Sequence, residues 1–168
     1  GGMNSIVFQE MREARGLAYS ANARYVTPGK EGETYSFTTF IATQNDKMMD
    51  CISVFNNILD EMPQSENAFN VAKQALTKSL ESRRTTRFSV LYKYLSNQYL
   101  GIDYDINEKI YNALPNLTLK DIVEFEKQNM AKKPYKYIIL GNEKELDIKA
   151  LEKIGPIKRL TTEQIFGY

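Results

Sequence analysis

The sequence has no histidine and only one cysteine, Cys51, among its 168 residues. The common protein sites for zinc use three histidines, two histidines with a glutamate, or mixtures of cysteine and histidine, and none of these can be assembled from this chain. The lack of histidine also excludes Ser-His-Asp and Cys-His catalytic groups. No Asp-x-Asp-x-Asp-Gly loop for calcium occurs. We therefore expect neither a self-contained hydrolase of these kinds nor an internal disulfide.

The sequence also has no large excess of either positive or negative charge, and it has no long apolar run. Twenty-two basic and 21 acidic side chains leave a net charge of +1, whereas nucleic-acid-binding proteins usually carry a strong basic excess. No run approaches the roughly 18 apolar residues that a membrane span requires, and residues 1–5 show no basic region followed by an apolar stretch of the kind found in signal peptides. A 42% apolar and 26% charged composition fits one globular domain over residues 1–168. The sequence is compatible with either a periplasmic or a cytoplasmic location in a bacterium.

Hydrophobic periodicity predicts a helix, a β-hairpin, several helices and a late strand. The first helix is capped by Asn4 or Ser5 and ended by Gly16, where a left-handed residue fits. The further predicted elements are strands over 17–27 and 33–43 around a turn at 28–32, helices over 45–62, 65–84, 90–100, 106–114 and 118–133, a buried strand over 135–140, a short helix over 148–153 and a final segment over 156–160 that fits a strand.

This order predicts an α+β fold, in which helices pack on one face of a mostly antiparallel sheet. Three strands are few for such a sheet, and the chain opens on a capped helix. We therefore expect a domain that lacks its first strand and helix, so that residues 1–168 form one domain truncated at its amino end. An unpaired sheet edge or an exposed apolar helix face would follow, and self-association of the fragment with it.

Residues 1–20, GGMNSIVFQEMREARGLAYS, carry a family resemblance. They resemble the signature of the zinc-free, carboxyl-terminal domains of insulinase/pitrilysin-type zinc metallopeptidases, where a glycine-rich turn leads into a helix, then R-E-x-x-G-L-A-Y, then a strand. The hairpin, the helix from Asn45 and the apolar run that ends in Gly141-Asn142 follow the same family order. The resemblance therefore spans nearly the whole chain, and its most specific part is Arg12 to Tyr19.

The resemblance implies a function in a clamshell of two halves. One half binds zinc through an H-x-x-E-H motif whose glutamate activates the attacking water. The other half has lost that motif, faces the zinc across a chamber, and reaches the site with an arginine and a tyrosine seven residues apart. Here those residues are Arg12 and Tyr19. The resemblance thus implies a peptide substrate, no cofactor in this chain, and zinc in a partner domain in cis or in trans. The alternative is a structural or processing-partner subunit with no peptidase role.

The chemistry of the two side chains agrees with this role, although each also has a simpler explanation. A phenol or guanidinium donor aimed at the developing oxyanion of peptide hydrolysis is worth about a hundred- to a thousandfold in rate. The pair could instead hydrogen-bond the substrate backbone. In the simpler explanation, Arg12 complements the dipole of its helix and Tyr19 is a half-buried strand aromatic. The full motif favours the functional interpretation.

Several other features have structural explanations. We expect Asn22 and Arg24 on the strand face opposite Tyr19, and Cys51 as a buried, inert thiol. A basic cluster with nearby aromatic residues could suggest nucleic-acid binding, but the balanced charge favours a solvated helix end. Two acidic pairs could mimic a metal site and are better explained as surface charge. The basic cluster is Arg83, Arg84 and Arg87 with Tyr92 and Tyr94, and the acidic pairs are Glu10/Glu13 and Glu143/Glu145.

Overall fold

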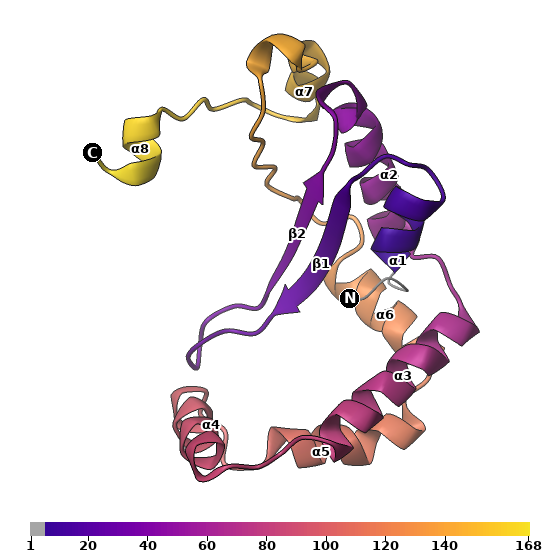
Figure 1. The fold of residues 1–168 in the computed structure, drawn as a ribbon, viewed down its shortest axis with the longest axis vertical. Coiled ribbons are helices and arrows are strands. Elements are labelled where there is room, and N and C mark those ends of the chain that lie inside the picture. Colours follow the sequence, from indigo (N-terminus) through magenta and orange to yellow (C-terminus); the bar gives the residue numbers. More distant parts are fainter. Residues whose placement is uncertain (1–5) are drawn as a thin grey trace.

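The computed structural model describes residues 6–168, so the expected caps Asn4 and Ser5 lie outside the described residues. It has the α+β architecture that the sequence predicts: one antiparallel hairpin with helices packed on one of its faces (Figure 1). The elements are α1 Ile6–Phe8, the π-helical turn η1 Gln9–Glu13, β1 Ser20–Val26, β2 Ser36–Ala42, α2 Met48–Asp60, α3 Glu66–Glu81, α4 Arg87–Tyr99, α5 Ile106–Ala113, α6 Leu119–Asn129, α7 Ile148–Ile154 and α8 Thr162–Phe166. Short 3₁₀ turns are η2 Asn45–Lys47, η3 Leu114–Asn116 and η4 Glu143–Glu145.

The hairpin has one covered face and one open face. Ala21 pairs with Ile41, and Tyr25 pairs with Phe37, so these residues share a face. Asn22 and Arg24 of β1 and Thr38 and Phe40 of β2 point the other way because side chains alternate across a strand. On that second face Phe40 keeps 57% of its surface exposed, and Arg24 reaches only Thr38, 3.5 Å from its Nε.

The core lies between the covered face of the hairpin, η1 and α2. Its buried members are Met11, Ala18, Ala21, Cys51, Phe55, Ile58 and Leu59. The α2 members follow a spacing of three and four residues, which places them on one side of that helix. Burial of each large apolar side chain contributes about 1.5–3 kcal/mol. The helices therefore cover one face of the sheet, as predicted, and the expectation that Cys51 is buried is confirmed.

The helices α3 to α5 form a second group away from the sheet (Figure 1). Ser65 caps α3 at the start of the predicted helix, and Thr86 caps α4, which begins three residues before the predicted start at 90. Helix α4 is tied to the hairpin loop where the Glu31 amide donates to the Tyr99 carbonyl. Within the described part of the chain, no helix is long and apolar enough to cross a membrane.

Two predicted strands do not form. Residues 135–140 are extended but belong to no sheet, and Ile138 and Leu140 are 91% and 100% exposed. The prediction of a buried central strand was therefore wrong for this structure. A run of apolar residues indicates a tendency to be buried, but a strand also needs a neighbouring strand with which to form hydrogen bonds. Over residues 6–168, β2 bonds only with β1. The segment 156–160 is irregular as well.

Candidate functional site

Arg12 lies in the π-helical turn that precedes the hairpin. Its guanidinium carbon sits 5.1 Å from the centre of the Phe8 ring, and its Nε is 3.9 Å from a carboxylate oxygen of the neighbouring Glu13. The side chain is otherwise exposed. π-Helical turns are rare and occur often at functional sites, and this one sets the direction from which Arg12 leaves the backbone.

Gly16 closes this turn as the sequence predicts. Its φ is +57°, in the left-handed region that glycine adopts without a steric penalty. Its amide donates to the Arg12 carbonyl at 3.0 Å, and the Leu17 amide donates to the Met11 carbonyl at 2.9 Å. The chain thereby reverses within a few residues and enters β1, which ties the orientation of the helical turn to the start of the strand.

Tyr19 stands immediately before β1 and is anchored by its backbone. Its amide donates to the Ala42 carbonyl at 2.8 Å, which extends the β1–β2 ladder by one bond. Its ring is 66% exposed, and its hydroxyl accepts a hydrogen bond of 3.0 Å from the Gln44 side-chain amide. The simpler explanation of Tyr19 as a half-buried strand aromatic therefore does not hold, because most of the ring is exposed at the start of the hairpin.

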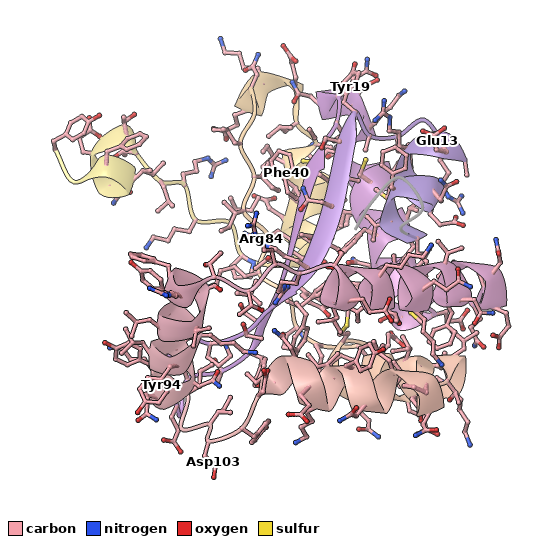
Figure 2. All side chains as sticks on the ribbon, turned by 60° about the horizontal axis from the view of Figure 1, so that its bottom comes forward. Glu13, Tyr19, Phe40, Arg84, Tyr94 and Asp103 are labelled. Atoms are coloured by element: carbon pink, nitrogen blue, oxygen red, sulfur yellow. The ribbon has the colours of Figure 1, made fainter. Side chains whose placement is uncertain are left out.

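Arg12 and Tyr19 lie on either side of the Gly16 closure, Arg12 in η1 and Tyr19 at the start of the hairpin. Figure 2 labels Tyr19 at the start of β1 and Glu13 in the turn that precedes the hairpin. Among residues 6–168, no hydrogen bond joins the two predicted site residues directly. The Tyr19 hydroxyl and the Arg12 guanidinium therefore stay available to a third molecule. The Tyr19 oxygen accepts one hydrogen bond from Gln44, and the Arg12 guanidinium makes one long contact with Glu13.

A polar hollow lies next to Tyr19 and was missed by sequence reasoning. Its lining includes Gln44, Asn45 and Glu145, whose carboxylate accepts hydrogen bonds from the side-chain amides of Asn45 and Asn142 at 2.6 and 2.8 Å. Gln44 lies two residues past β2 and one residue beyond the position that would face Tyr19 in the β1–β2 register, and this placement was a sequence signal for the hollow. Glu145 is exposed, as expected for surface charge, and its carboxylate also joins η2, which follows β2, to the start of η4.

The other acidic candidates pair with nearby cations. Glu10 lies 3.5 Å from Arg15, and Glu143 pairs with Arg159. The Arg159 hydrogen bond and charge hold the pKa of the Glu143 carboxyl below its usual range. Within the described chain, no three histidine, cysteine, aspartate or glutamate side chains are grouped closely enough to bind a metal ion.

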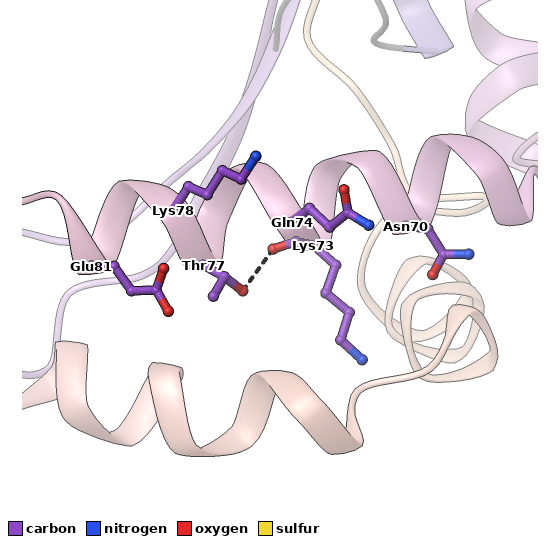
Figure 3. Close-up of a pocket in the computed structure, with 6 residues that line it drawn as sticks. All are labelled: Asn70, Lys73, Gln74, Thr77, Lys78 and Glu81. Carbon is purple, nitrogen blue, oxygen red and sulfur yellow. Dashed lines mark hydrogen bonds between the residues drawn. The ribbon is translucent and has the colours of Figure 1, made fainter.

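The basic cluster at the end of α3 is exposed, with Arg84 and Tyr94 at separate places on the molecule (Figure 2). Nearby, α3 carries a second shallow hollow lined by polar side chains, including Asn70, Lys73 and Glu81 (Figure 3). Lys73 has a structural role, because its ammonium donates hydrogen bonds to the carbonyls of Pro115 and Leu117 at 2.9 and 3.0 Å. Glu81 accepts from the Tyr111 hydroxyl, so this hollow serves mainly to join α3 to α5.

Comparisons with known proteins agree with the motif that contains Arg12 and Tyr19. Residues 1–76 match the family model described as the peptidase M16 inactive domain. A protein of Helicobacter pylori named "Non-peptidase homolog YmxG" is 23% identical over 151 residues, which cover 86% of this chain and 34% of that protein. The chain thus spans about a third of the length of the relative it matches. The family resemblance predicted from the motif is confirmed over residues 1–76, which are similar to the inactive domains of the M16 peptidases.

Proposed function

We propose that this chain is the non-catalytic half of a zinc metalloendopeptidase. It closes the substrate chamber and supplies Arg12 and Tyr19 to a zinc site built by a partner domain. The observation that carries the proposal is the exposed Tyr19 hydroxyl at the end of the hairpin, beside the turn that carries Arg12. The match of residues 1–76 to inactive M16 domains supports a role without catalytic metal in this half.

The local structure supports Tyr19 as a pre-oriented hydrogen-bond donor. The Ala42 carbonyl fixes its backbone, and Gln44 donates to the phenol oxygen, so the phenol proton remains free to point outward. A donor held in place before reaction needs little reorganisation when negative charge develops on a substrate oxygen. The same geometry also suits a hydrogen bond to a carbonyl of the peptide backbone.

Arg12 supports the proposal through charge. A guanidinium carries a positive charge and presents several donors in a plane, which suits a carbonyl oxygen or a carboxylate. The contact with the Phe8 ring holds the side chain, while its long approach to Glu13 is exposed and contributes little energy. A substrate group could therefore replace Glu13 at small cost.

The partner half would supply all the metal chemistry. When bound there, zinc polarises the scissile carbonyl and activates water, while this chain would orient the peptide and exclude solvent. The partner could belong to the same polypeptide or to another one.

A second candidate is a scaffold or processing-partner subunit of the same fold. One observation favours it: the relative from Helicobacter pylori is named a non-peptidase homolog. In that case Arg12 and Tyr19 would contribute to assembly or to peptide binding and not to turnover.

The test is reconstitution of this chain with a zinc-bearing half and measurement of peptide cleavage. Tyr19→Phe and Arg12→Lys should each lower kcat/KM by about tenfold or more. Tyr25→Phe and Arg24→Lys are matched controls, since they change a tyrosine and an arginine of β1 away from this end and should leave cleavage unchanged. Assembly with normal cleavage by both site variants would support the scaffold and contradict the leading proposal.

A further inference from the structure

Gln44 lies between β2 and η2, in a segment that is held on both sides. The preceding residue, Thr43, donates from its hydroxyl to the Leu17 carbonyl at 2.5 Å. The following residue, Asn45, donates from its side-chain amide to the Glu145 carboxylate of η4 at 2.6 Å. The Gln44 carbonyl also accepts a backbone bond of 3.1 Å that starts η2. These bonds fix the point from which the Gln44 side chain leaves the backbone.

The Tyr19 backbone is joined to the same segment. Its amide donates to the Ala42 carbonyl at 2.8 Å, and the bond from Thr43 reaches the chain two residues before Tyr19, at Leu17. Since both backbones are held, only side-chain rotations have to be ordered when the Gln44 Nε2 meets the Tyr19 hydroxyl at 3.0 Å. The entropy lost in a contact lies in the groups that it orders, so this pairing costs less than one between two mobile loops.

The direction of this hydrogen bond determines what the Tyr19 hydroxyl can do. A side-chain amide nitrogen carries donors and no acceptor, so the Tyr19 oxygen accepts here and its own proton points elsewhere. In the part of the chain that the structure describes, this bond with Gln44 is the contact that the Tyr19 hydroxyl makes. A hydroxyl that accepts one hydrogen bond donates a stronger one, because linked hydrogen bonds polarise each other. Gln44 therefore makes Tyr19 a better donor toward an outside group.

We propose that Gln44 is a positioning residue for Tyr19, which keeps the phenol a hydrogen-bond donor toward the bound peptide. This inference rests on the function proposed above for Tyr19. In that function the phenol must donate to the substrate oxygen on which negative charge develops. An acceptor at position 44 would take the same proton and leave the substrate without its donor. Gln44 acts through Tyr19 and needs no contact of its own with the peptide.

The fold depends little on this side-chain pair, which allows its role to be tested by substitution. Gln44 and the Tyr19 ring are both exposed. A neutral hydrogen bond contributes about 0.5–1.5 kcal/mol to stability. Replacement of Gln44 should therefore leave the circular dichroism spectrum unchanged, so that any effect on cleavage reports on the site and not on unfolding.

The first test uses this chain alone and does not depend on peptidase activity. In nuclear magnetic resonance spectra, the side-chain amide signals of Gln44 should shift in Tyr19→Phe, which removes only the hydroxyl that they contact. Tyr25→Phe removes the hydroxyl of another β1 tyrosine and should leave these signals in place. Signals that do not respond to Tyr19→Phe would overturn the proposal, whatever the function of the chain.

The second test is the cleavage rate after reconstitution with a zinc-bearing half. Gln44→Glu keeps the shape of the side chain and turns the donor into an acceptor. It should lower kcat by about tenfold or more, close to the effect of Tyr19→Phe, while KM changes little. Gln44→Met keeps the length of the side chain without either polar group. It removes one neutral hydrogen bond and should lower kcat by only about two- to tenfold.

A double-mutant comparison separates action through Tyr19 from a general effect of the new charge. In the Tyr19→Phe background, Gln44→Glu should slow cleavage no further, because no phenol proton is left to redirect. Gln98→Glu introduces the same charge at an exposed position of α4 and should leave cleavage unchanged.

The outcomes distinguish this inference from the proposed function. If Tyr19→Phe slows cleavage and Gln44→Glu does not, the positioning role is wrong while the proposed role of Tyr19 stands. An equal loss from Gln44→Glu with and without the Tyr19 hydroxyl would also overturn the positioning role. If Tyr19→Phe itself leaves cleavage unchanged, the proposed function fails, and the positioning role fails with it.

Discussion

Glu126 of α6 is a buried carboxylate that should make the protein less stable as pH rises. The residue is 4% exposed, and its Oε1 has no hydrogen-bond partner in the described structure. Burial raises the pKa of Glu126 above its ordinary value of 4.5, the negative charge of Asp60 raises it further, and Lys127 partly opposes this. The folded state therefore holds a proton more tightly than the unfolded state.

The sign of the pH dependence follows from this difference in pKa. A group with a raised folded pKa contributes its full stability below its unfolded pKa and loses it as pH rises through the folded pKa. The stabilising contribution of protonated Glu126 should therefore fall from about pH 4.5 upward. An unpartnered buried polar group costs about 1–3 kcal/mol. Glu126→Met keeps the length of the side chain without that group, so it should raise the free energy of unfolding by about 1–3 kcal/mol at pH 8.

Urea unfolding at pH 5 and pH 8, at one protein concentration, measures this effect. The gain of Glu126→Met over the original protein should be larger at pH 8 than at pH 5. Glu124→Gln is the control, since Glu124 is an exposed neighbour on α6 whose ion pair with Lys120 contributes little. A Met variant that is less stable at pH 8, or one whose gain is the same at both pH values, would refute the reasoning.

Three further changes test the framework that positions the site. Gly16→Ala should lower the free energy of unfolding by about 1–2 kcal/mol through its left-handed backbone alone, since an added Cβ meets no atom within 4 Å; an unchanged urea midpoint would contradict this. Phe55→Ala removes a core ring and should cost about 3–5 kcal/mol, measured by the same unfolding, with exposed Phe88→Ala as a near-neutral comparison. Thr118→Ala removes the capping box of α6 and should lower the free energy of unfolding by about 0.5–2 kcal/mol. Unchanged hydrogen-exchange rates in the first turn of α6 would contradict this.

Local sequence signals predicted the elements whose partners are close in the chain. The hairpin followed from alternating residues around a turn, and the helix starts at Ser65 and Thr118 followed from caps that bond three residues ahead. The left-handed backbone of Gly16 was predicted because a glycine that ends a helix commonly adopts this conformation, whatever the distant parts of the chain do. The π-helical form of the turn before it was not predicted, since it depends on how Met11 packs into the core.

Elements that depend on distant partners were not predictable in the same way. Residues 135–140 have the composition of a central strand, but composition does not provide the neighbouring strand that bonding requires. The site shows the same division. Arg12 and Tyr19 could be identified from their motif, whereas the bond from Gln44 to Tyr19 depends on the register of two strands.

The most direct test of the proposed function is the single-turnover rate of peptide cleavage by this chain reconstituted with a zinc-bearing half. The proposal predicts that Tyr19→Phe, which removes only the hydroxyl, slows the chemical step by about tenfold or more while peptide binding changes little. A rate equal to that of the unchanged protein, with assembly intact, would contradict a role for Tyr19 in the partner's active site.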